Sequence, residues 1–224
     1  MPNKTPEPLY MFHTGQAHVN NFNALGEEFA KHIPLNHMVR EDILADAIKL
    51  GYVSDKNKTV IFKIWHEMAK NASVLMNTCS TLGALADEFN QHSKIPMLRI
   101  DRPMAELAAK NSGNIAVCTG IMCTLFSSHD LVYKLAHHHN PNAHVTGYVA
   151  TSAFKHYLAG DFKRYEQEIL LLLRHAATNA NTLVLATASM APAAKHLSDE
   201  LNIYTSPKSG FLAAKAVWEH QQSK

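Results

Sequence analysis

Short runs of apolar, β-branched and aromatic residues alternate with longer amphipathic segments along almost the whole of this 224-residue chain. This alternation is typical of βαβ units, in which helices join parallel strands and cover both faces of the sheet. The sequence therefore predicts an α/β fold with mainly parallel sheets flanked by helices. The expected strands are residues 9–13, 73–78, 96–100, 114–119, 144–150, 182–187 and 202–206. The expected helices are residues 41–51, 57–71, 81–93, 103–111, 127–139, 161–179 and 208–221, the first of them capped by Gly51.

The composition is that of an ordinary globular protein and excludes several classes of partner. The formal net charge is +2 and the lysines and arginines are scattered, so nucleic acid is not an expected partner. The longest apolar runs, such as residues 169–173, are too short to cross a membrane, and the first ten residues do not resemble a secretory signal. Three cysteines without a disulfide framework favour the reducing cytoplasm. The fifteen histidines lack zinc spacing, so the run at 137–139 is expected at the surface and no metal is expected.

Four polar loops follow expected strands directly. They read HTGQ, NTCSTLG, CTGIMCT and ATASMAP, and occupy residues 13–16, 77–83, 118–124 and 186–192. In parallel α/β folds, ligands bind outside the carboxyl ends of the strands, where loops enter the next helix. The sequence therefore predicts that these four loops form one functional rim.

Cys79 stands where an expected strand ends and a helix begins. The exposed N–H groups of a first helical turn favour the thiolate, so we expect the pKa of Cys79 to lie below that of a free thiol. Ser80 and Thr81 can cap the helix and donate to a carboxylate, and Ser189 offers a second set of donors of the same kind. The alternative is a buried cysteine that only fills space. That alternative is preferred for Cys118, which lies inside an apolar strand, and we expect Cys79 to alkylate faster than Cys118.

His13 ends the first expected strand, and Thr14 and Gly15 mark the turn into the next helix. An imidazole here can act as a base, bind a carboxylate or be a core histidine with its hydrogen bonds satisfied. Its position at the end of a strand favours a role in the site.

Residues 73–83 and 182–192 resemble each other and form a weak internal repeat. A repeat of this kind suggests two duplicated halves. The second copy carries Thr187 and Ala188 where a thiol matching Cys79 would be expected.

Seven motifs, taken in their order along the chain, resemble those of a known family. FHTG, LMNTCSTLG, IDRPMAELA, NIAVCTGIMCTL, AGDF, LVLATASMAP and YTSPKSG together resemble the aspartate/glutamate/hydantoin racemase superfamily, from about residue 9 to the end. The resemblance implies two similar α/β lobes, with the active site in the cleft between them and no cofactor. The lobes expected from it are residues 1–101 with 205–224, and residues 102–204.

The resemblance also implies roles for individual residues. In the family, two cysteines on opposite faces of the substrate remove and return the proton α to a carboxylate. Cys79 matches the first of these cysteines. The second falls at Thr187, or at Ala188 if the internal repeat sets the alignment. Because a threonine hydroxyl is too weak an acid to exchange protons near neutral pH, a symmetric two-thiol mechanism does not fit this chain.

Further residues match the substrate-binding loops of the family. Ser80 and Thr81 match the anion-binding residues beside the first cysteine, and Ser189 belongs to the corresponding second loop. The remaining matches lie in the first and third loops. They are His13, Thr14 and Thr124, with Gly120 and Cys123 where the family often has threonines.

Three functions follow from these residues. The first is a cofactor-independent isomerase or racemase acting α to the carboxylate of a small acid, with Cys79 as the catalytic thiol. The second is a one-thiol decarboxylase, lyase or cis-trans isomerase on the same fold, and the third is a carboxylate-binding protein without catalysis. A symmetric homo-oligomer is expected by default.

Overall fold

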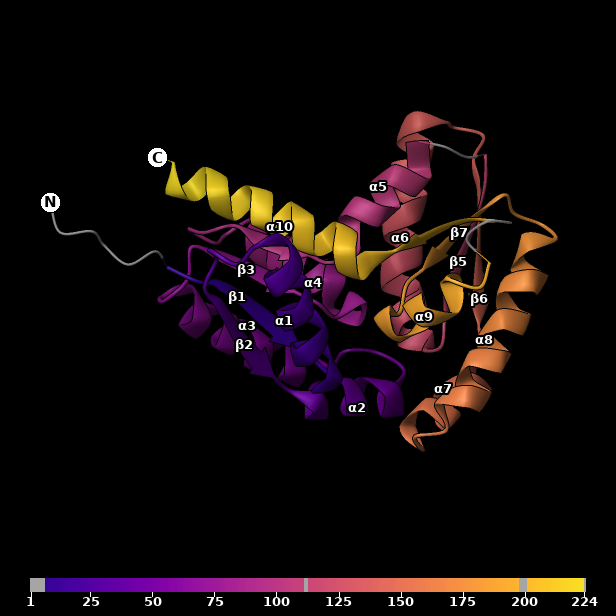
Figure 1. Ribbon diagram of the computed structural model, residues 1–224, viewed down its shortest axis with the longest axis horizontal. Helices are drawn as coiled ribbons and strands as arrows, with labels where there is room; N and C mark the ends of the chain where they lie inside the picture. Colours follow the sequence, from indigo (N-terminus) through magenta and orange to yellow (C-terminus); the bar gives the residue numbers. More distant parts are fainter. Residues whose placement is uncertain (1–6, 111–112, 198–200, 224) are drawn as a thin grey trace, which may run out of the picture. The chain divides into compact units, whose positions relative to one another are not determined.

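The computed structural model describes residues 7–110, 113–197 and 201–223 (Figure 1). It divides into two compact units, one formed by Met1–Ile100 with Lys208–Lys224 and the other by Asp101–Pro207. The boundaries predicted from the sequence follow residues 101 and 204. No described helix is both long enough and apolar enough to cross a membrane.

The first unit contains a four-stranded parallel sheet in the order β2-β1-β3-β4. Successive residues of its central strands pack on opposite faces: Phe12 and Leu75 belong to one core cluster, whereas Met11 and Met76 belong to another. Both faces are therefore apolar, as expected for a covered parallel sheet. The strands are β1 (Leu9–His13), β2 (Leu35–Val39), β3 (Val74–Asn77) and β4 (Met97–Arg99).

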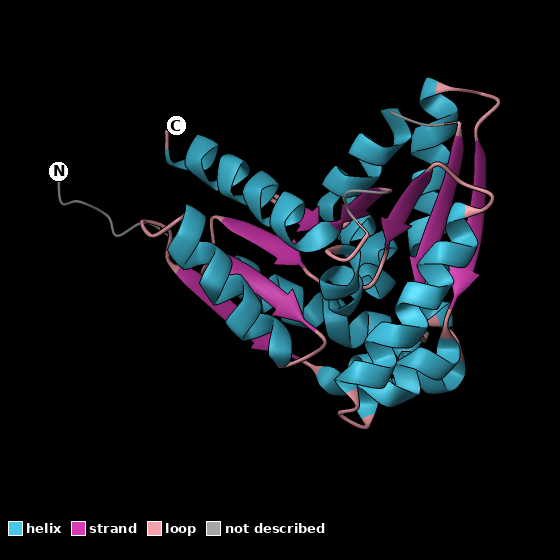
Figure 2. Cartoon of the chain, turned by 45° about the vertical axis from the view of Figure 1, so that its right-hand side comes forward, coloured by secondary structure: helices cyan, strands magenta, loops and turns pink. Residues whose placement is uncertain are grey.

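The helices of this unit cover the two faces of its sheet (Figure 2). Trp65 of α3 and Phe89 of α4 pack on one face, and Phe22 of α1 packs with Phe211 of α10 on the other. The helices are α1 (Ala17–Phe29), α2 (Glu41–Leu50), α3 (Asp55–Ala69), the short 3-10 helix η1 (Ser80–Leu82), α4 (Gly83–Asn90) and α10 (Ser206–Gln222).

The second unit repeats this architecture with the strand order β6-β5-β7-β8. Cys118 and Leu185 face one core cluster, and Val117 and Val184 face the other. The strands are β5 (Asn114–Thr119), β6 (His144–Val149), β7 (Thr182–Leu185) and β8 (Asn202–Thr205). The helices are α5 (Arg102–Lys110), α6 (Met122–His139), α7 (Thr151–Leu158), α8 (Phe162–Ala177), η2 (Ala188–Met190) and α9 (Ala191–Ala194).

The two sheets have the same strand order and the same register. Phe12 pairs with Asn77 in the first, and Cys118 pairs with Leu185 in the second. The internal repeat predicted from the sequence is therefore present as a repeated half of the fold.

Several elements differ from the sequence prediction. Strand β2 was missed because LNHMV is only half-buried at the sheet edge and does not alternate between apolar and polar residues. Helix α1 was missed because its three asparagines and one glycine have low helix propensity. The four loops lie at the carboxyl edges of two separate sheets, with two of the loops at each edge.

Gly83 provides a test of the packing at the start of α4. A Cβ at this position would collide with the guanidinium of Arg99, which is 5% exposed and pairs with Asp87 at 2.8 Å. We expect Gly83→Ala to lower the free energy of unfolding by about 1–3 kcal/mol, as measured by urea denaturation. The matched control is Gly113→Ala, whose Cβ would lie 3.9 Å from its nearest neighbour, Asn140. Equal effects of the two substitutions would contradict this packing.

Candidate active site

The loop after β3 holds Cys79 in an extended conformation, with φ −103° and ψ 108°, just before η1. The N–H of Leu82 donates to the Cys79 carbonyl at 2.9 Å, which closes the first turn. The side-chain amide of Asn77 donates to the same carbonyl at 2.9 Å and accepts from the Cys79 N–H at 3.2 Å. Both the N–H and the carbonyl of Cys79 are therefore hydrogen-bonded.

Cys79 is 8% exposed, and hydrogen-bond donors surround its sulfur. Burial raises its pKa above the ordinary value, against the opposing effect of the Thr14 and Thr81 hydroxyls and the N–H groups of Leu82 and Thr81. The predicted lowering of the Cys79 pKa is therefore wrong. The sequence showed the donors at the helix start but did not show how completely the thiol is removed from water.

This arrangement suits a proton donor. Burial keeps the proton on sulfur at neutral pH, and the four donors stabilise the thiolate once the proton has left. Cys118 has only the first of these properties: it is fully buried in β5, and burial raises its pKa to about 12.

His13 is completely buried at the end of β1 and uses both ring nitrogens. Nδ1 lies 2.8 Å from the Thr78 hydroxyl, and Nε2 lies 2.8 Å from Nδ1 of His37. Burial, followed by the neighbouring His37 and His18, lowers the pKa of His13 to about 3. The ring is therefore neutral, and neither nitrogen is left for a ligand. In this structure His13 is a core histidine that supports the residue preceding Cys79.

The direction of the hydrogen bonds around His13 follows from counting protons. The Thr78 hydroxyl donates to the Phe12 carbonyl at 3.0 Å, so it accepts from His13 Nδ1–H. His13 Nε2 then accepts from His37 Nδ1–H, which leaves Nε2 of a neutral His37 as an acceptor. Oδ1 of Asn23 is placed 3.0 Å from that nitrogen, and exchanging the amide oxygen and nitrogen of Asn23 lets Nδ2 donate to it. A continuous chain of donors thus runs from exposed Asn23 to buried Thr78.

The loop after β7 repeats the Cys79 loop with a hydroxyl in place of the thiol. Thr187 stands just before η2 with φ −113° and ψ 122°, and the N–H of Met190 donates to its carbonyl at 2.9 Å. Thr187, rather than Ala188, is therefore the structural counterpart of Cys79.

The side chains of this second loop bond among themselves. The hydroxyls of Thr187 and Thr119 are 2.8 Å apart, and Thr119 also accepts from the Ile121 N–H at 3.1 Å. Ser189 contacts the hydroxyl of Tyr165 at 2.7 Å, and burial raises the pKa of Tyr165 to about 12. These hydroxyl groups can hydrogen-bond to a polar ligand but do not titrate near neutral pH.

The remaining predicted residues fall into the two units separately. Ser80 is buried in the Cys79 loop. Gly120 lies against Phe154, which a Cβ would approach to 3.4 Å. Cys123 and Thr124 are buried in the first turn of α6, which begins at Met122 and not at residue 127. Thr14, Thr81 and Cys79 form one group of contacts, and His13 joins it through Thr78.

Asn77, Thr119 and Tyr165 were not predicted from the sequence as site residues. Asn77 and Thr119 are polar residues at the ends of otherwise apolar buried strands, and this is the signal that could have identified them. Tyr165 comes from the distant helix α8, and nothing local in the sequence connects it to Ser189.

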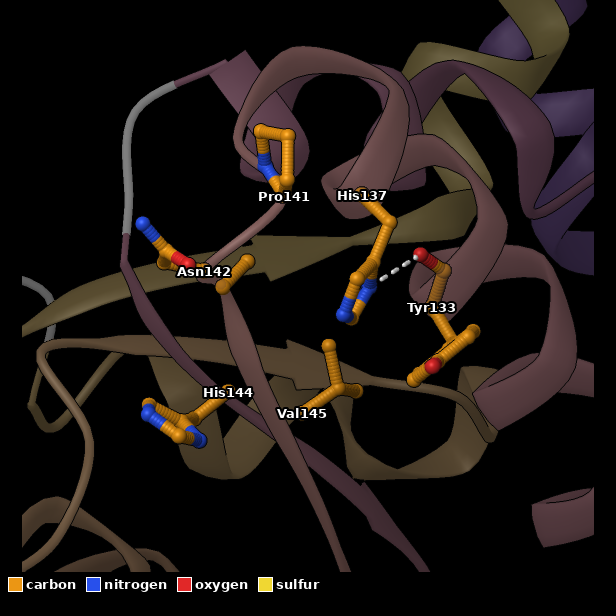
Figure 3. A pocket seen from close by; sticks show the side chains of 7 residues that line it. Tyr133, His137, Pro141, Asn142, His144 and Val145 are labelled. Atoms are coloured by element: carbon orange, nitrogen blue, oxygen red, sulfur yellow. Dashed lines mark hydrogen bonds between the residues drawn. The ribbon is translucent and has the colours of Figure 1, made fainter.

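A pocket of about 410 Å³ lies elsewhere in the second unit (Figure 3). His137 and His144 line it, with Nδ1 of His137 bonded to the Tyr133 carbonyl at 3.0 Å. His144 pairs with Asn114 at the amino end of β5, so this pocket is at the opposite end of the strands from Thr119. Within the described ranges, no group of three or more His, Cys, Asp or Glu side chains is placed to hold a metal ion.

Comparison of the fold with solved structures identifies its class. Glutamate racemase isoform RacE1 from Bacillus anthracis matches with a TM-score of 0.75 and 14% identity, over 97% of this chain and 84% of that one. Picrophilus torridus aspartate racemase matches with a TM-score of 0.68 and 13% identity, over 96% and 94%. A glycine-to-cysteine mutant of arylmalonate decarboxylase matches with a TM-score of 0.55 and 14% identity, over 95% and 93%.

The chain thus has the same fold as these racemases, with two α/β units that each contain a four-stranded parallel sheet, and the α/β fold predicted from the sequence is confirmed. At these identities the likeness is one of fold. No family model matches the sequence, and no curated protein matches it.

The neutral state of His13 predicts a pH dependence of stability. Its folded pKa of about 3 lies below the ordinary value of 6.5, so the stabilisation is complete above pH 6.5 and is lost as the pH falls toward 3. We expect wild type to lose about 2 kcal/mol more unfolding free energy than His13→Gln between about pH 7.5 and pH 5. Urea denaturation at the two pH values measures the loss of unfolding free energy in each protein. Equal losses in wild type and His13→Gln would show that His13 is not the source of the pH dependence.

The donors around Cys79 give a second prediction. Thr81→Val removes one hydroxyl from the sulfur, so the pKa of Cys79 should rise further. The pH profile of alkylation at Cys79, followed by peptide mass spectrometry, measures this pKa, with Cys118 as the buried reference. Thr182→Val, a buried substitution in the second unit, should leave the profile unchanged. If the pH profile of Cys79 alkylation in Thr81→Val were identical to that of wild type, the Thr81 hydroxyl would not be a donor to the sulfur.

Proposed function

We propose that this protein is an enzyme that transfers a proton at the carbon α to the carboxylate of a small acid, without a cofactor. Cys79 is the group that delivers the proton, on one face of the reacting carbon. The observation that carries the proposal is the buried thiol with four donors aimed at its sulfur, in a fold whose second half has Thr187 at the equivalent position.

The chemistry follows from the state of the thiol. In the one-sided reaction the C–CO₂⁻ bond next to a second carboxylate breaks, CO₂ leaves, and the electron pair stays on the α carbon, delocalised onto the remaining carboxylate. The S–H bond of Cys79 then breaks, its proton joins the α carbon, and the electron pair stays on sulfur as a thiolate. The hydroxyls of Thr14 and Thr81 and the two N–H groups stabilise that thiolate until water reprotonates it.

The fold supports this class of substrate. The matched structures are a glutamate racemase, an aspartate racemase and an arylmalonate decarboxylase, and each is named after a carboxylic acid. A one-thiol reaction such as decarboxylation needs no acid at Thr187. For this reason we favour the one-sided reaction.

Racemisation is the second candidate, because the matches with the higher TM-scores are racemases. It requires another acid or base for the opposite face of the α carbon. Thr187 bonds to the Thr119 hydroxyl, and a hydroxyl is too weakly acidic for this task near neutral pH.

Incubation in D₂O with aspartate, glutamate, hydantoins, maleate and arylmalonates tests the proposal by NMR. The one-sided enzyme should form a single stereoisomer carrying deuterium at the α carbon, whereas a racemase should exchange the α proton and lose optical rotation. Cys79→Ser should lower the rate by at least about 10²-fold, because serine is a much weaker acid. Cys118→Ala, which removes a buried thiol in β5, should retain activity.

Thr187→Cys separates the two candidates further. It supplies a thiol at the counterpart of Cys79, so on the one-sided account racemisation should appear only in this variant. Full activity of Cys79→Ser would contradict the proposal. Binding of an acid with no turnover in any variant would favour the non-catalytic carboxylate-binding protein.

A further inference from the structure

Asn77 places a polar amide inside an apolar sheet. It is the last residue of β3, completely buried, and its neighbours Leu75 and Met76 belong to the two hydrophobic clusters on either face. Burying an amide is unfavourable unless its donor and acceptor are both used. Here both are used on one residue: Nδ2 donates to the Cys79 carbonyl and Oδ1 accepts from the Cys79 N–H.

The second unit shows that the fold does not need this amide. Leu185 occupies the equivalent register position, because it pairs with Cys118 as Asn77 pairs with Phe12. Two residues later, Thr187 has nearly the same backbone angles as Cys79 without any such side chain. An apolar residue is therefore sufficient for the turn, and the amide is an addition in the half that carries the thiol.

We propose that Asn77 is a positioning residue for the Cys79 thiol. By holding the N–H and carbonyl of Cys79 together, its amide fixes the direction of the Cα–Cβ bond and keeps the sulfur against Thr14, Thr81 and the N–H of Leu82. The catalytic consequence rests on the proposed function, but the positioning itself does not.

The two bonds are not equivalent. The Cys79 carbonyl also accepts from the N–H of Leu82, so it keeps a partner when the amide is removed. The acceptor of the Cys79 N–H is Oδ1 of Asn77, so the loss of that oxygen leaves a buried donor without a protein acceptor. Without that acceptor, the Cys79 N–H can hydrogen-bond to water only if the loop opens. Opening of the loop also exposes the thiol.

The experiment measures alkylation of Cys79 by iodoacetamide in the full-length protein, with Cys118 followed in the same sample by peptide mass spectrometry. Asn77→Ala should raise the rate at Cys79 about tenfold, the change in open population expected from the loss of roughly one net hydrogen bond. The rate at Cys118 should not change. Asn90→Ala is the matched control, because it removes a side-chain bond to the Met97 N–H in the same unit.

Asn77→Asp provides a second variant that preserves the shape of the side chain. Its carboxylate still accepts from the Cys79 N–H but no longer donates to the carbonyl, so its rate at Cys79 should lie between those of wild type and Asn77→Ala. If Asn77→Ala does not fold, a rise at Cys79 alone in Asn77→Asp decides in favour of the proposal. An unchanged ratio of the Cys79 and Cys118 rates, or a joint rise of both, would overturn it, because a merely structural role moves both cysteines together.

A kinetic readout distinguishes this proposal from the proposed function. With an active substrate, Asn77→Ala should lower kcat and leave KM unchanged, because the misplaced group is the proton donor. The alkylation result stands even if no substrate is turned over, so failure of the proposed function leaves the positioning of Cys79 testable.

Discussion

Parallel pairing of the two central strands is the constraint on which each half of this molecule depends. In the first unit, the Thr78 N–H donates to the Phe12 carbonyl at 3.0 Å, and in the second the Ala186 N–H donates to the Cys118 carbonyl at 2.8 Å. These bonds join the ends of neighbouring strands, so two loops distant in sequence meet at one edge. Thr14 reaches the sulfur of Cys79 for this reason.

Burial and hydrogen-bond donors have opposing effects on the pKa of the Cys79 thiol. Burial alone raises the pKa of Cys118 to about 12 and makes it inert. Cys79 experiences the same burial but has four donors at its sulfur, which reduce the cost of forming a thiolate. A thiol that holds its proton at rest and tolerates losing it is suited to protonate a carbanion. The second half repeats the backbone of the loop with Thr187 in place of Cys79, so the two equivalent loops carry different chemical groups.

The sequence predicted the features that depend on local patterns. Apolar strands and the polar loops that follow them gave the α/β fold and placed Cys79 at a strand end. The features that depend on tertiary contacts could not be read in the same way. His13 bonds to His37 on β2, an edge strand without a clear pattern, so its burial was not predictable. The choice between Thr187 and Ala188 needed the backbone register, and the sign of the Cys79 pKa shift needed the extent of burial.

The central claim is that Cys79 is a thiol at neutral pH. The most direct test is an NMR titration of the Cβ carbon in protein labelled with ¹³C-cysteine, assigned with Cys79→Ser. We predict that the Cys79 signal stays at its thiol position through neutral pH and moves only above the pKa of a free thiol, because burial outweighs the four donors. A thiolate signal at neutral pH would contradict the account, since Cys79 would then accept a proton rather than supply one.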